Sequence, residues 1–124
     1  MAGLGGLSQL AQALPGDYAW QKAGTQGITG DRAYWSSIAS SADGTKLAAV
    51  GEESGSIYTS TDSGVTWTEQ TGAGERDWRS IASSADGTKL AAAVYGGPIY
   101  TSTDSGSTWT QQTDAGSRGW QSIA

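Results

Sequence analysis

The chain has 124 residues, of which 36% are hydrophobic and 15% charged, a size and composition typical of one globular domain rather than a disordered segment. Its net charge of -5 arises from twelve carboxylates against seven scattered Lys and Arg, so we expect neither nucleic acid nor membrane surface as a partner. The absence of Cys and His excludes disulfides, thiolate chemistry, the commonest metal ligand and the commonest general base. No cofactor is predicted.

Residues 1–17 are predicted to form an N-terminal leader. No basic residue precedes its apolar positions, and Gly, Ser and Gln interrupt them, so the segment makes a poor signal peptide and no membrane span. The Leu spacing from Ser8 to Leu14 allows two turns of helix before Pro15 and Gly16, and a loose leader is the alternative. The sequence leaves the cellular compartment open.

Residues 18–34 are predicted to be the end of a repeat unit, because Tyr18-Ala-Trp20-Gln-Lys resembles the last strand of the units that follow. Two complete units occupy 35–77 and 78–119, and residues 120–124 begin a further one. Thirteen consecutive residues at 37–49 recur unchanged at 80–92, and eight at 57–64 recur at 99–106. Periods of about 40 residues are typical of stacked units such as propeller blades.

Each unit is predicted to contain four antiparallel strands, which in the second unit we expect at 78–84, 89–95, 99–103 and 108–113. The pair Asp86-Gly87 is typical of a two-residue hairpin, whose positive φ angles these residue types tolerate. Gly96-Gly97-Pro98 is expected to end the second strand, and Asp104-Ser105-Gly106 to turn the chain into the fourth.

A single sheet of this kind carries apolar residues on both faces and must therefore stack on neighbours. The predicted fold class is all-β, with four-stranded antiparallel meander blades of a β-propeller and about two and a half blades per chain. A flat β-solenoid is the alternative, although its coils are usually shorter than this period.

Both units contain the pattern Ser-x-Asp-x-Gly-x-x-Trp, formed by Ser60, Asp62, Gly64 and Trp67 and again by Ser102, Asp104, Gly106 and Trp109. The chain thus resembles the Asp-box (sialidase-type) repeat β-propeller family over most of 35–124, whereas residues 14–20 keep only Trp20 of a third box. In that family the box resembles a folded hairpin turn between the third and fourth strands of a blade.

The expected role of each box is structural. Its Asp carboxylate can accept backbone N–H groups within the turn, its Gly can take positive φ, and its Trp can pack beneath the turn. Calcium binding is the alternative role of Asp62 and Asp104, but each box supplies one carboxylate where several are normally needed. No metal site is predicted.

The resemblance also raises catalysis, because sialidases of this family use three Arg, a Tyr nucleophile paired with Glu, and an acidic proton donor at the centre of six blades. This chain has two full blades, and three of its four Arg recur before a unit-starting Trp, which indicates a repeated structural feature. Glu52 and Glu53 could do acid–base work, but adjacent side chains usually point apart. We predict that the chain is not an enzyme; a fragment of a sialidase-like or other Asp-box glycoside hydrolase is an alternative.

Candidate ligand-binding residues lie in the loops that a propeller places opposite the Asp-box turns. They are Arg32, Arg76, Arg118, Tyr95, and the unit-starting Trp35, Trp78 and Trp120, with Glu52 and Glu53 in the same loops. One Arg–Trp pair per blade could hold a sugar or a peptide by hydrogen bonds and stacking, as in a lectin. In the alternative, each Trp packs between blades while Arg covers it.

Closed propellers typically have four to eight blades, so one copy cannot close a ring. Two apolar blade faces and the terminal strands at 18–22 and 120–124 would remain open, and we expect several copies to associate as a homo-oligomer. The two terminal strands make only half a blade; either that blade is abbreviated, or residues 1–34 supply more strand, or the chain belongs to a longer array. The predicted function is a non-catalytic, self-assembling binding or scaffold module.

Overall fold

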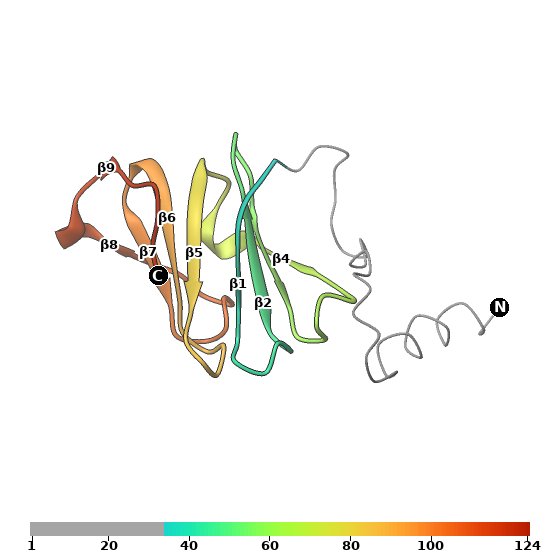
Figure 1. Ribbon diagram of the computed structural model, residues 1–124. Coiled ribbons are helices and arrows are strands. Elements are labelled where there is room, and N and C mark those ends of the chain that lie inside the picture. The colour runs from blue at the N-terminus through green and yellow to red at the C-terminus, as the bar shows by residue number, and fades with distance from the viewer. Residues whose placement is uncertain (1–33) are drawn as a thin grey trace, which may run out of the picture.

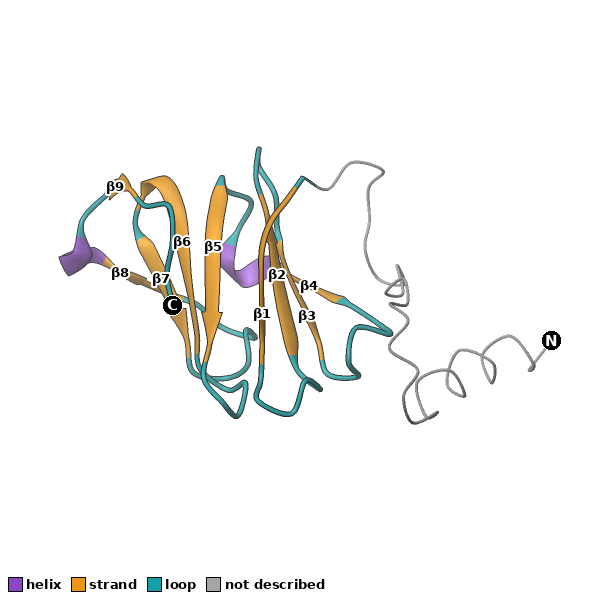
Figure 2. Ribbon diagram, viewed as in Figure 1, coloured by secondary structure: helices purple, strands orange, loops and turns teal. Residues whose placement is uncertain are grey.

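The computed structural model describes residues 34–124, which form two antiparallel sheets (Figures 1 and 2). The first sheet has the order β1 (Trp35–Ser40), β2 (Leu47–Gly51), β3 (Ile57–Ser60), β4 (Thr68–Gln70), and the 3-10 turn η1 (Thr71–Ala73) follows it. The second has the order β5 (Trp78–Ser83), β6 (Leu90–Gly97), β7 (Ile99–Ser102), β8 (Thr110–Gln112), followed by η2 (Thr113–Ala115). The predicted all-β class with four-stranded meander blades is confirmed. The leader, the helix at 8–14, Arg32 and all but the last residue of the partial blade at 18–34 lie outside the described residues.

Each sheet presents two different faces, because side chains alternate along a strand and directly opposed residues share a face. In the second sheet, the ladder aligns Ile81, Ala92 and Tyr100 on one face, and Ser80, Ala93 and Ile99 on the other. The first sheet repeats this pattern with Ile38, Ala49 and Tyr58 on one face. We call the face that carries Ile38 or Ile81 face A and the opposite one face B.

The two sheets stack with face B of the first against face A of the second (Figure 1). Their shared core contains Ala48, Val50, Ile57 and Ala73 from the first sheet, and Trp78, Ile81, Leu90, Ala92, Val94 and Tyr100 from the second. Small Ala side chains on the inner strands let the backbones of the two sheets approach closely. Each blade contributes one face to this shared core. Stacking is therefore the main source of apolar burial.

The chain reverses between the first two strands of each unit as predicted, but the loop differs from a two-residue hairpin. Ser84 N–H donates to Lys89 O at 2.9 Å, which closes a four-residue loop, and of Asp86 and Gly87 only the glycine has positive φ. The Asp86 carboxylate accepts hydrogen bonds from Ser84 and Thr88 inside this loop. Asp86 therefore lacks the positive φ that the predicted two-residue turn requires.

The sequence predicted that Gly96-Gly97-Pro98 would end the second strand. In the structure Gly96 and Gly97 continue β6. The extension pairs with β9 (Arg118–Gly119), with Tyr95 opposite Gly119 and Gly97 opposite Arg118. The first unit has the matching bridge between Gly55 and Arg76. The loop that follows each fourth strand thus folds back onto the hairpin between the second and third strands of its own unit.

Residues 120–124 pack on the second sheet without being part of a regular strand. Ile123 N–H donates to Ser80 Oγ at 3.1 Å, and Ile81 N–H makes the corresponding bond to Ser37 Oγ at 3.3 Å. The segment therefore lies against β5 much as β5 lies against β1. Among the described residues, no helix is long and apolar enough to cross a membrane.

Candidate interaction site

The two Ser-x-Asp-x-Gly-x-x-Trp turns contain the same network of hydrogen bonds. Asp104 Oδ1 accepts Thr108 N–H and Ser102 Oγ–H, both at 2.8 Å, and Oδ2 accepts Thr108 Oγ1–H at 2.6 Å. Ser102 Oγ accepts Gly106 N–H at 2.9 Å, and Trp109 Nε1 donates to Gly106 O at 2.8 Å. The equivalent contacts in the first turn join Ser60, Asp62, Gly64, Thr66 and Trp67 at 2.6 to 3.1 Å.

These hydrogen bonds stabilise the ionised Asp. The Thr66 and Thr108 hydroxyls, followed by the N–H groups of the same residues, lower the pKa of Asp62 and Asp104 to about 2. In the loops between the first two strands, the N–H of Thr45 and the hydroxyl of Ser41 lower the pKa of Asp43 to about 2. The pKa of Asp86 is lowered still further, chiefly by Thr88 N–H.

The same carboxylates have little capacity left for a ligand, because both oxygens of each Asp-x-Gly turn already accept bonds from that turn. Within residues 34–124, no group of three acidic side chains is arranged to hold a metal ion. Gly64 and Gly106 have φ of 87° and 92°, so backbone conformation as well as hydrogen bonding fits a structural turn.

The unit-starting Trp residues have different environments. Trp78 is fully buried and packs against Tyr100 in a T-shaped arrangement, with ring centroids 5.4 Å apart. Trp78 has no surface for a ligand, and its position allows only the packing role. Trp35 makes the corresponding contact with Tyr58 at 5.6 Å but is 43% exposed. Trp120 is half-buried.

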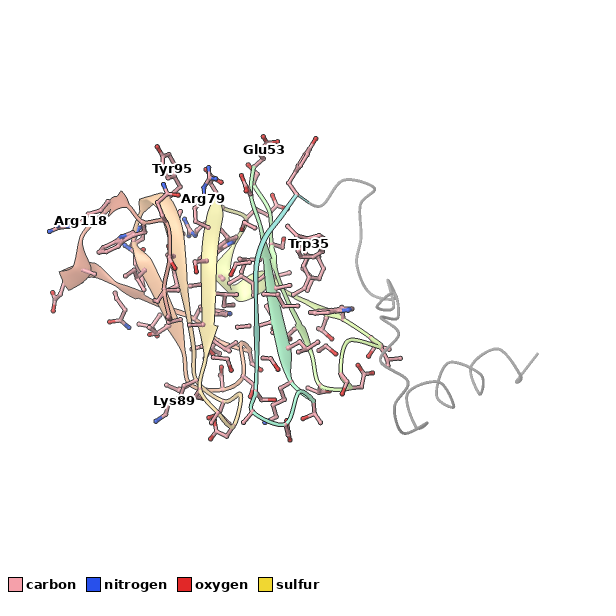
Figure 3. All side chains as sticks on the ribbon, in the orientation of Figure 1. Trp35, Glu53, Arg79, Lys89, Tyr95 and Arg118 are labelled. Carbon is pink, nitrogen blue, oxygen red and sulfur yellow. The ribbon has the colours of Figure 1, made fainter. Side chains whose placement is uncertain are left out.

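Arg76 is placed across the boundary between the sheets. Its Nε donates to Ala73 O at 3.0 Å, and its guanidinium carbon lies 4.7 Å from the centre of the Tyr100 ring. A cation thus covers the ring of Tyr100, which in turn packs against Trp78. Arg118, the equivalent residue of the second unit, is exposed, and Figure 3 shows it pointing away from the sheets.

Glu53, Arg79 and Tyr95 lie at the end of the sheets opposite the Asp-containing turns, while Lys89 lies at the other end (Figure 3). Arg79 bonds Glu52 at 2.9 Å and Asp77 at 3.2 Å, and its guanidinium lies 4.8 Å from the Tyr95 ring centre. Arg79 was not among the site residues predicted from the sequence. Its signal is a departure from the repeat, because the first unit has Ser36 at that position.

Glu52 and Glu53 have different surroundings, although they are adjacent. Glu52 is engaged by Arg79, whereas Glu53 is exposed and has a φ of 54°. The geometry gives the pair no shared target for acid–base chemistry. Instead, Glu52 joins the loop of the first sheet to the first strand of the second.

A hollow of about 190 Å³ opens beside Trp35 at the edge of face A of the first sheet. Its walls include three aromatic residues, Tyr34, Trp35 and Tyr58, and four carboxylates, Glu52, Glu53, Glu69 and Glu75. A larger and shallower hollow of about 370 Å³ lies on face B of the second sheet, where Ala91, Thr101 and Thr103 line it. At the matching place between the stacked sheets, only about 20 Å³ remains.

No protein-family model matches the chain, and no curated protein matches it. Among solved structures, the chain is similar to a GH74 enzyme from Niastella koreensis, with 31% sequence identity and a TM-score of 0.55. The match covers 87% of this chain but 15% of that enzyme, so the chain spans a small part of the enzyme's length. This likeness agrees with stacked propeller-type blades.

Proposed function

We propose that the chain is a non-catalytic Asp-box β-propeller module that associates head to tail with copies of itself and serves as a binding or scaffold unit. The carrying observation is the contrast between two equivalent side chains. Ile81 is 4% exposed because face A of the second sheet packs on the first, whereas Ile38, in the same place on the first sheet, is 62% exposed. No other part of residues 34–124 covers Ile38.

The stacked pair inside the chain supplies the template for the contact between copies. Face B of the second sheet repeats Ala48 as Ala91 and carries a hollow where face B of the first sheet is filled. Face A of a second copy would pack there as face A of the second sheet packs on the first, with Leu47 at the hollow as Leu90 is at the internal one. Its β1 would take the place that residues 120–124 hold beside β5. Burial of an apolar side chain of this size contributes about 1.5–3 kcal/mol.

Head-to-tail association can be tested by mixing two variants, because each copy uses face A in one contact and face B in the other. Ile38→Asp places a charge on face A alone, and Ala91→Asp places one on face B alone. Each variant should be monomeric by itself, and their mixture should form a dimer of two 12.7 kDa chains, because one good face of each kind remains. Tyr95→Asp, which changes an exposed aromatic residue near the end of β6, is the control and should associate like the wild type.

The mixture decides between head-to-tail and symmetric association. If both faces A met each other, Ile38→Asp would remain monomeric in the mixture, and Ala91→Asp would associate alone. Light scattering on size-exclusion chromatography reads both results. Near-ultraviolet circular dichroism of each variant checks that the aromatic packing of the monomer is retained.

A second candidate function is carbohydrate binding at the loop face, and the likeness to a GH74 enzyme favours this ligand class. Tyr95 is half-exposed there and is stacked by Arg79, which suits contact with a sugar ring. A glycan array probed with the wild type and with Tyr95→Ala tests it. Binding lost in the variant would support the site, and an array without signal would exclude it for the sugars presented.

A further inference from the structure

We infer that Arg118 of one copy docks in the hollow beside Trp35 of the next copy, with its guanidinium over the ring of Tyr58. The inference rests on the head-to-tail association proposed above and names the contact that orients it. In this contact the carboxylates around the hollow bind the exposed Arg118.

The contact already exists once inside the chain. Arg76 leaves the loop after β4 of the first sheet and lies over Tyr100 on face A of the second, 4.7 Å from the ring centre. Tyr58 is the equivalent of Tyr100, and both are held by a unit-starting Trp in nearly the same geometry, with interplanar angles of 75° and 73°. The pair formed by Trp35 and Tyr58 is therefore already arranged to receive a guanidinium group.

The loop that carries Arg118 repeats the loop that carries Arg76. Both follow a 3-10 turn, and Gly74 and Gly116 have φ of 75° and 72°. Each glycine N–H donates to the first residue of its turn at 3.1 Å, and each Arg pairs with the hairpin of its own sheet. Stacking a second copy as the internal sheets stack, with its β1 replacing residues 120–124 beside β5, would bring Arg118 over Tyr58.

The hollow differs from the internal site in charge, and the difference favours a cation. Glu69 lies opposite Tyr58 on β4, where the second unit has Gln111 opposite Tyr100. Ser56 Oγ donates to Glu69 at 2.6 Å and positions its carboxylate in the wall. Glu53 and Glu75 also line the hollow, so Arg118 would gain charge pairing that Arg76 lacks beside Gln111.

The test compares self-association constants from sedimentation velocity for a small set of variants. Arg118→Gln should weaken association about tenfold through loss of the cation–π contact and the charge pairing. Glu69→Gln, which gives the hollow the composition of the internal site, should weaken it less and reduce its dependence on salt. The reversal Arg118→Glu should weaken association more strongly, and Glu69→Arg in the same chain should restore most of it.

Arg118→Lys is the matched control, because it keeps the positive charge beside the carboxylates of the hollow. It should associate more strongly than Arg118→Gln. If Arg118→Gln associates like the wild type while Ile38→Asp is monomeric, the association stands and the docking of Arg118 is overturned. Failure of Glu69→Arg to rescue Arg118→Glu would also count against the contact. A monomeric wild type would overturn the proposed association itself, and the docking with it.

Discussion

Ile81 N–H donates to Ser37 Oγ across the boundary between the two sheets, at 3.3 Å. The same bond recurs at the next boundary, where Ile123 N–H donates to Ser80 Oγ at 3.1 Å. Each unit therefore contacts its predecessor through the same hydrogen bond, which joins the Ser-Ile pairs that begin successive units. A neighbouring copy would follow the same pattern by placing its Ile38 where Ile123 now lies against Ser80.

The equivalent residues Trp78 and Trp35 should differ sharply when each is replaced by Ala. Trp78→Ala opens a cavity in the core between the sheets and should lower the free energy of unfolding by about 3–5 kcal/mol. Trp35→Ala should lower it by less than about 1 kcal/mol, because that side chain is half-exposed. Urea unfolding in the Ile38→Asp background, where association is absent, gives both values. Equal effects would show that the sheets do not stack as described.

Asp104→Ala should lower the melting temperature by several degrees, because the turn loses three hydrogen bonds to its carboxylate. Asp114→Ala is the matched control: it removes the same charge from an exposed position whose side chain makes no hydrogen bond within residues 34–124. Differential scanning calorimetry reads both variants. A melting temperature that is unchanged in Asp104→Ala would mean that the turn is not structural.

Acid should destabilise the fold through the four Asp residues whose pKa is lowered, namely Asp43, Asp62, Asp86 and Asp104. Unfolded Asp titrates near pH 3.9, so between about pH 5 and pH 2 the unfolded chain binds more protons than the folded one. The stabilisation from these groups is present above this range and is lost as pH falls through it. In Asp62→Asn/Asp104→Asn, the urea midpoint should fall less between pH 5 and pH 2.5. An identical fall in the variant would contradict this assignment.

Much of the fold follows from the sequence because the repeat multiplies each local signal. The strands at 78–83, 99–102 and 110–112 lie within their predicted ranges, since Trp, Ile, Tyr and Thr bounded by Gly and Asp turns favour short strands. The loop at Asp86 was not predictable from the Asp-Gly pair. Its conformation depends on Ser84 and Thr88, which both donate hydrogen bonds to the Asp86 carboxylate.

The site is less accessible to prediction because identical residues have different neighbours. Trp35 and Trp78 are indistinguishable by local pattern, yet one is half-exposed and the other lies in the core. Arg79 shows the opposite case, since it breaks the repeat and its partners, Glu52 and Asp77, come from other segments. The sequence pattern identifies the repeated residues, whereas the stacking of the sheets determines which of two equivalent residues is exposed to a partner.

The mass of the wild-type chain in solution, measured by light scattering on size-exclusion chromatography across a concentration series, tests head-to-tail association most directly. The stacking of Ile81 and the exposure of Ile38 predict a species at a multiple of 12.7 kDa, whose share grows with concentration. A single 12.7 kDa species at every concentration would contradict the association of copies through faces A and B.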